Sequence, residues 1–190
     1  MNIGLYFGSF NPIHIGHLII ANIMAEHTDR VWFVVSPQNP FKKNKSLLHE
    51  FDRYEMVEKA IQDNHRLHVT DVEFSMPKPS YTIDTLAYLS EKHPQHKFRL
   101  IIGADNLPQF PKWKNHNAIL ENYGLLVYPR PGATVSQWLD DSRVELIDAP
   151  MLDISASYIR KAIKNKISIR YLVPEVVERY IEKQGYFLKA

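Results

Sequence analysis

The sequence predicts an α/β fold with a doubly wound parallel sheet covered by helices on both faces. Short apolar runs alternate along the chain with longer segments of helical character, and the runs are nearly continuous in Val, Ile, Leu and Phe. Such runs are typical of strands that are buried on both faces. With 190 residues, 45% of them hydrophobic, the chain suits one domain spanning 1–190, with a helical part at about 150–190 packed on it.

The individual elements follow from these runs and from the residues that flank them. The predicted strands are residues 3–7, 31–35, 67–72, 98–103, 124–128 and 144–147, and the predicted helices are residues 18–25, 51–63, 80–92, 117–122, 155–164 and 174–183. Ser80 and Ser155 are expected to be helix N-caps. Pro174 is expected in a first helical turn, and Gly185 just beyond the end of the last helix.

Charge and cysteine content limit the classes of partner. The net charge of +2 gives no electrostatic case for binding nucleic acid. The absence of cysteine excludes disulfides and thiolate metal sites and is compatible with a reducing cytoplasm. No signal peptide or membrane span is apparent, so we expect a cytoplasmic protein that binds neither nucleic acid nor membrane.

The segment from Gly8 to His17 joins the first predicted strand to the first predicted helix. Free backbone N–H groups and the helix dipole at such a turn attract phosphate, and Gly8 and Gly16 allow close approach of a ligand. His14 and His17 are three residues apart, so they face the same way on a helical turn and can donate hydrogen bonds to phosphate oxygens. Singly, each feature also fits an ordinary cap or loop, and only the combination indicates function.

A second anion-binding candidate lies near the C-terminus. Ser155, Ser157 and Arg160 place hydroxyls, a helix N-terminus and a guanidinium on one side of a predicted helix. The alternative is an ordinary capped helix with a surface arginine. A basic loop that contains Lys42, Lys43 and Lys45 could neutralise phosphate charge, or could simply be solvated.

Three further segments could bind the rest of a nucleotide. Asp105 follows a strand and could accept a hydrogen bond from ribose, and Trp113 lies in a Pro-flanked loop where it could stack on a planar ring. The helix start at 80–82 could hold a small carboxylate, although the charge of Asp84 would compete with it. The alternatives are that Asp105 and the helix start at 80–82 only cap helices or form turns, and that Trp113 only fills space beneath its loop. In a Rossmann-like sheet these loops meet outside the carboxyl ends of the strands, at the switch point of the strand order.

The segment His14-Ile15-Gly16-His17 resembles the His-x-Gly-His signature of the nucleotidyltransferase superfamily. Further matching segments follow in the order seen in bacterial nicotinate mononucleotide adenylyltransferases, namely 79–82, 101–105, 110–113, 130–132 and 154–160. This resemblance covers nearly the whole chain. It implies an enzyme of NAD biosynthesis that joins ATP and nicotinate mononucleotide by direct in-line transfer, with Mg²⁺ held by substrate phosphates and without dedicated protein ligands.

The resemblance also assigns roles to residues. It implies catalytic roles for His14, His17, Lys42 and Arg160. ATP would contact Gly8, Ser9, Phe10, His14, Gly16, His17, Gly103, Asp105, Ile154, Ser155, Ser157 and Arg160. Nicotinate mononucleotide would contact Ser36, Lys42, Tyr81, Thr82 and Trp113, with the pyridine ring on the indole and the carboxylate at a helix N-terminus.

Three positions depart from the family pattern, namely Ser36, Phe41 and Lys114, and they affect the mononucleotide side. Alternatives within the class are an adenylyltransferase for nicotinamide mononucleotide or for phosphopantetheine. Class I aminoacyl-tRNA synthetases share the His-x-Gly-His motif, but the chain is short and lacks a Lys-Met-Ser-Lys-Ser-like loop. A non-catalytic nucleotide-binding regulator is the remaining alternative. The sequence leaves homo-oligomerisation open.

Overall fold

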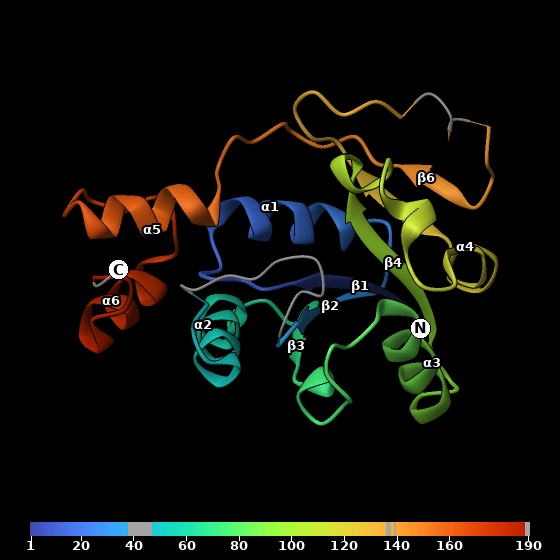
Figure 1. Ribbon diagram of the computed structural model, residues 1–190, viewed down its shortest axis with the longest axis horizontal. Coiled ribbons are helices and arrows are strands. Elements are labelled where there is room, and N and C mark those ends of the chain that lie inside the picture. Colours follow the sequence, from blue (N-terminus) through green and yellow to red (C-terminus); the bar gives the residue numbers. More distant parts are fainter. Residues whose placement is uncertain (38–46, 136–137, 139, 189–190) are drawn as a thin grey trace.

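The computed structural model describes residues 1–190 except 38–46, 136–137, 139 and 189–190. Its centre is a six-stranded parallel sheet with the order β3-β2-β1-β4-β5-β6 (Figure 1). The strands are β1 (Asn2–Gly8), β2 (Arg30–Val35), β3 (Leu67–Thr70), β4 (Lys97–Gly103), β5 (Leu125–Tyr128) and β6 (Val144–Leu146). This order is that of a doubly wound Rossmann-type sheet, so the predicted fold class is confirmed.

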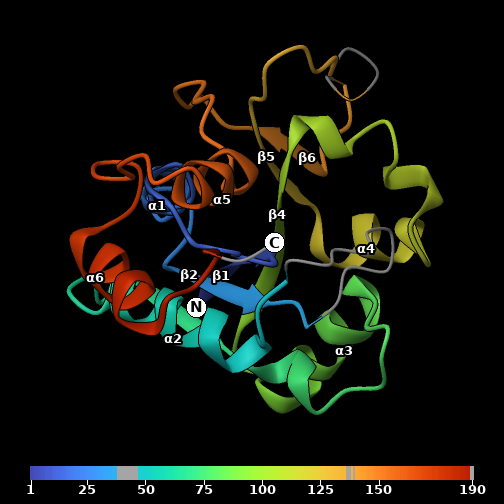
Figure 2. The ribbon, with the colours of Figure 1, turned by 60° about the vertical axis from the view of Figure 1, so that its left-hand side comes forward.

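The helices of the described residues cover both faces of the sheet. They are α1 (Ile15–Met24), α2 (Glu50–Ile61), α3 (Thr82–Lys92), α4 (His116–Tyr123), α5 (Ala156–Lys164) and α6 (Glu175–Gln184). Buried residues of α1, α2, α5 and α6 share one core with Tyr6 and Phe33, whereas those of α3 and α4 share a second core with Leu5 and Leu100. Because successive strand residues point to opposite faces, each inner strand supplies both cores. The start of α5 lies next to the start of α1 (Figure 1), and Figure 2 shows the same neighbourhood from another side.

Most predicted elements are present, with ends that differ by a few residues. The predicted strand at 67–72 is too long, because β3 ends at Thr70 and a 3₁₀ turn, η1 (Val72–Phe74), follows it. Two more 3₁₀ turns, η2 (Ala104–Asn106) and η3 (Phe110–Lys112), fill the connection after β4. No helix in the described part of the chain is both long and apolar enough to cross a membrane.

The predicted caps have different outcomes. The prediction for Ser155 is confirmed, since its hydroxyl accepts a hydrogen bond of 3.2 Å from the Tyr158 N–H, and Gly185 ends α6 with φ of +67°. Pro174 is the residue before α6 and lies just outside its first turn. The prediction for Ser80 is wrong, because α3 begins at Thr82 with Tyr81 as its N-cap, and the Ser80 hydroxyl donates to Glu73 at 2.9 Å instead.

Candidate active site

The candidate site lies where the strand order reverses. Strands β1 and β4 are neighbours in the sheet although β2 and β3 separate them along the chain. The chain leaves β1 at Gly8 and β4 at Gly103, so the helices that follow diverge there and open a crevice at the carboxyl ends of the strands.

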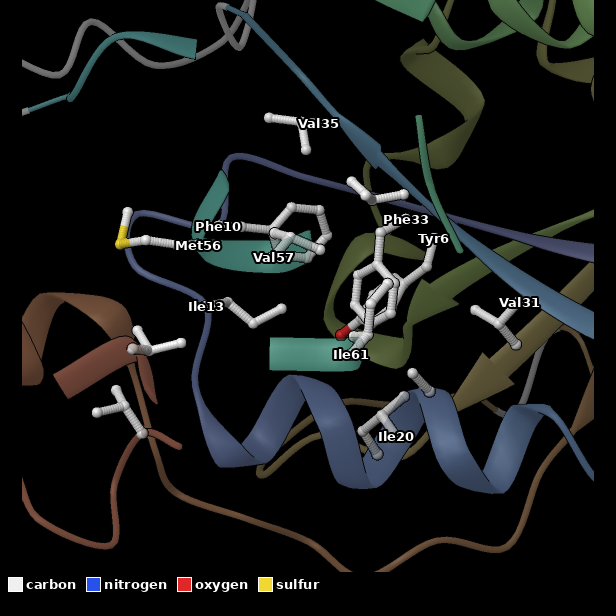
Figure 3. Packing of buried hydrophobic residues seen from close by; sticks show 14 of the residues in the cluster. Tyr6, Phe10, Ile13, Ile20, Val31, Phe33, Val35, Met56, Val57 and Ile61 are labelled. Carbon is white, nitrogen blue, oxygen red and sulfur yellow. The ribbon is translucent and has the colours of Figure 1, made fainter. Parts of the chain in front are cut away.

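The turn after β1 is fixed by apolar side chains that enter the core. Phe10 has a positive φ of 45° and is only 2% exposed, and Ile13 is fully buried (Figure 3). A Cβ at Gly8 would lie 2.7 Å from the Phe10 ring. Gly8 therefore makes room for this ring, a role that differs from the ligand approach expected from the sequence. Any contact of Phe10 with ATP would have to come from its backbone, since its side chain is in the core.

His14 and His17 form a stacked pair at the start of α1. Their ring centroids are 3.7 Å apart with an interplanar angle of 24°, and the His14 N–H lies 3.3 Å from Nδ1 of His17. Because that Nδ1 accepts a hydrogen bond, a neutral His17 carries its proton on Nε2 and can donate it to a ligand. Gly16 provides space for this arrangement, because a Cβ there would be 3.1 Å from the His14 ring.

Both imidazoles are neutral near pH 7. Burial, with a smaller contribution from the positive charge of Arg130, lowers the pKa of His14 to about 4. Burial also brings the pKa of His17 well below 6.5, with smaller contributions from His14 and Arg130. A polyphosphate bound here would meet two neutral donors and one permanent cation, a combination that can stabilise negative charge as it develops.

A cavity of about 180 Å³ opens next to the two rings. Its lining comes from four parts of the chain: Tyr6 at the end of β1, the start of α1, the end of β5 with Arg130, and the segment 150–156 that leads into α5. The hydroxyls of Tyr6 and Tyr128 are 3.2 Å apart. His14, His17, Gly16, Ile154 and Ser155 therefore border one space, although more than a hundred residues separate the two groups in the sequence.

The start of α5 is tied directly to the turn after β1. Nη1 of Arg160 donates to the Asn11 carbonyl at 2.8 Å, and Nη2 lies 3.2 Å from the Ser157 hydroxyl. The predicted grouping of Ser157 with Arg160 on one side of a helix is thus confirmed in geometry. Ser155 lines the cavity together with the two imidazoles, whereas Arg160 and Ser157 lie outside its lining and reach the turn after β1 through Asn11.

Sequence reasoning missed Arg130. It follows β5, lines the cavity, and its Nε lies 3.6 Å from the Asp105 carboxylate. A Cβ at Gly103 would collide with that carboxylate and would come within 3.0 Å of the Arg130 side chain, so Gly103 permits the pairing. Residues 130–132 match the family pattern, but their sequence alone indicates no role for the arginine. Asp105 stays exposed at the crevice edge.

Tyr81 and Thr82, two of the residues predicted for the mononucleotide, lie at the start of α3. Trp113 is partly buried and packs against Phe110, with 5.6 Å between ring centroids. Lys114 places its ammonium 4.8 Å from the centre of the Tyr81 ring and bonds both Asp84 oxygens, at 3.0 and 2.8 Å. The Asp84 charge that was expected to compete with a bound carboxylate is therefore paired. Thr82 is the first residue of α3, and Lys42 lies outside the described residues.

Residues 5–162 match the cytidylyltransferase-like family, and the chain belongs to that family. The chain is 60% identical over 189 residues to a "Probable nicotinate-nucleotide adenylyltransferase" of Cytophaga hutchinsonii, covering 98% of both chains. It is 47% identical to a relative of the same name from Flavobacterium psychrophilum, over the full length of both. The fold also resembles the Plasmodium falciparum nicotinic acid mononucleotide adenylyltransferase complexed with NaAD, with a TM-score of 0.80, 22% identity, and coverage of 98% and 97% of the two chains.

Proposed function

We propose that this chain is a nicotinate-nucleotide adenylyltransferase, which joins ATP and nicotinate mononucleotide to give nicotinate adenine dinucleotide and pyrophosphate. The observation that carries the proposal is the cavity at the sheet switch point, where His14, His17, Arg130 and Ser155 meet. The names of relatives that align over nearly the full chain give the substrates.

The reaction is a direct displacement at phosphorus. A phosphate oxygen of the mononucleotide attacks the α-phosphorus of ATP, a new P–O bond forms, and the bond to the β-phosphate oxygen breaks as pyrophosphate leaves. The chain's residues act by position and charge. The Nε2–H of neutral His17 and the guanidiniums of Arg130 and Arg160 stabilise the charge that shifts to the leaving group, and Ser155 and Ser157 donate hydrogen bonds to the same phosphates.

We further propose that magnesium arrives with the substrates. The described residues hold no group of three or more His, Asp or Glu side chains arranged to bind a metal, and Asp105 is already paired with Arg130. A magnesium ion that is bound mainly by phosphate oxygens and water needs few protein ligands, and the ion would neutralise charge on the triphosphate.

We also propose that the chain forms one domain. The cytoplasmic location stays a prediction from the sequence.

The acid form of the mononucleotide fits better than the amide. The N-terminus of α3 favours a negative group next to Tyr81 and Thr82, and the ammonium of Lys114 neutralises the competing charge of Asp84. An uncharged carboxamide gains less from this field.

The test is pyrophosphate release from ATP with a panel of acceptors: nicotinate mononucleotide, nicotinamide mononucleotide and 4′-phosphopantetheine. We expect the first to have the highest kcat/KM and to yield a dinucleotide by chromatography. If the chain binds nucleotide but releases no pyrophosphate from ATP with any of the acceptors, the proposal is contradicted and a non-catalytic nucleotide-binding regulator is favoured.

A further inference from the structure

Arg53 of α2 is a fully buried arginine outside the cavity described above. Its guanidinium donates to four backbone carbonyls: Ser9 at 2.7 Å, Ser36 at 2.8 Å, Pro37 at 3.0 Å and Leu48 at 3.0 Å. Ser9 belongs to the turn after β1, whereas Ser36 and Pro37 follow β2. One side chain thus connects the two segments that flank the crevice on this side of the sheet.

Burying the charge of Arg53 costs free energy, because the guanidinium loses its hydration. Its four hydrogen bonds go to carbonyl oxygens, so carbonyl dipoles compensate the cation together with the nearby charges of Glu50 and Asp52. Burial lowers its pKa to about 10, so it stays protonated at neutral pH. Well-packed apolar residues often stabilise a core as well as a buried cation does, so the cation at this position indicates a geometric role.

The bonds continue from Ser36 to the start of α3. The Ser36 N–H donates to the Gly8 carbonyl at 2.9 Å, and the Ser36 side chain lies near the Glu73 carboxylate, where it offsets part of the rise that burial causes in the Glu73 pKa. Glu73 is 2% exposed and accepts from the hydroxyls of Ser80 and Thr85, at 2.9 and 2.8 Å. A path of contacts, buried at Arg53 and Glu73 and half-buried at Ser36, therefore runs from the phosphate turn to the helix that carries Tyr81 and Thr82.

We propose that Arg53 is a positioning residue that sets the distance between the ATP side and the mononucleotide side of the crevice, with Glu73 as the second link. This proposal rests on the proposed function, because it assigns the two sides to two substrates. Arg53 touches neither substrate. It holds Ser9 and Ser36 so that the mononucleotide phosphate and the α-phosphorus of ATP meet in line.

The direct test replaces Arg53 by Met and by Lys, and measures kcat and both KM values well below each variant's melting temperature. Arg53→Met removes all four hydrogen bonds, and we expect a tenfold or larger rise in the mononucleotide KM and a fall in kcat. The Kd for ATP, measured by calorimetry, should change less than threefold, because Arg160 still holds the turn through Asn11. Arg53→Lys keeps the charge with fewer, differently placed donors and should recover only part of the loss.

A matched control is Arg66→Met. Arg66 also donates to a backbone carbonyl, that of Thr28, and to Glu26, but it lies at the opposite end of the sheet, just before β3. Its loss should leave all kinetic constants unchanged. If Arg53→Met fails to fold, Glu73→Gln tests the same path from its other end and should give the same separation between mononucleotide KM and ATP Kd. Because the two residues act in one path, Arg53→Lys combined with Glu73→Gln should cost less than the product of the single losses.

Two results would overturn the positioning role. The first is a folded Arg53 variant whose kcat, KM values and ATP Kd are unchanged. The second is an equal loss of affinity for both substrates. If no Arg53 variant folds, the same two results in Glu73→Gln decide. These differ from failure of the proposed function, in which the wild-type chain itself would release no pyrophosphate with any acceptor.

Discussion

The two sides of the crevice are built differently. On the ATP side, His14 is buried with a lowered pKa, and hydrogen bonds such as that from Arg160 to Asn11 hold segments far apart in sequence. On the mononucleotide side, Tyr81 is exposed, and an ion pair between Lys114 and Asp84, each about half exposed, lies beside it. Folding therefore preorganises the first side, while the second depends on contacts that water and salt weaken. Substitutions on the ATP side should accordingly have larger effects than those on the mononucleotide side.

The largest effect is expected for His17→Ala. It removes the donor on Nε2, so kcat should fall by about a hundredfold or more while the ATP Kd changes little. Steady-state turnover and calorimetry measure the two quantities. The control is His65→Ala, an exposed histidine away from the crevice, which should have no effect. An unchanged kcat in His17→Ala would remove this residue from the mechanism.

The second prediction concerns pH and His14. Its pKa is about 4 in the folded protein and near 6.5 when unfolded, so the unfolded state binds the proton first as the pH falls. The stabilisation present above pH 6.5 is thus lost towards pH 4, and between pH 7.5 and 5 the loss from this group is about 2 kcal/mol. Urea unfolding at the two pH values measures it. His14→Gln should reduce the difference by that amount, and an equal pH dependence in both proteins would show that His14 titrates normally.

The sequence predicted the sheet and the geometry around His14 and His17 well, because there the signal was local. Near-continuous apolar runs predicted the strands, and the spacing of His14 and His17 predicted their common face, because both signals depend on neighbours in the chain. Arg53 and Arg130 were missed since their partners come from other elements and no spacing reveals them. Ser80 was predicted wrongly for the same reason: a cap and a donor to a buried Glu73 look alike in sequence.

On the mononucleotide side, Trp113→Ala tests the predicted stacking of the pyridine ring. Loss of an aromatic stacking surface costs roughly 1–3 kcal/mol per base, so we expect the KM for nicotinate mononucleotide to rise by about tenfold. The KM for ATP should stay within twofold, and Trp113→Phe should recover most of the affinity. If both substrates weaken equally, Trp113 supports the loop as a packing residue against Phe110.

The smallest effect is expected at Lys114, which departs from the family pattern. Lys114→Met leaves Asp84 unpaired beside the start of α3, where it would repel the carboxylate of the substrate. Because the pair is exposed, we expect the KM for nicotinate mononucleotide to rise by only about twofold to fivefold, and less at high salt. Adding Asp84→Asn should restore the KM, since the repelling charge is then gone, and Lys112→Met serves as the control for an exposed neighbouring lysine. The amide substrate carries no carboxylate, so its KM should not change, and an equal rise for acid and amide would show that Lys114 acts by packing on Tyr81 alone.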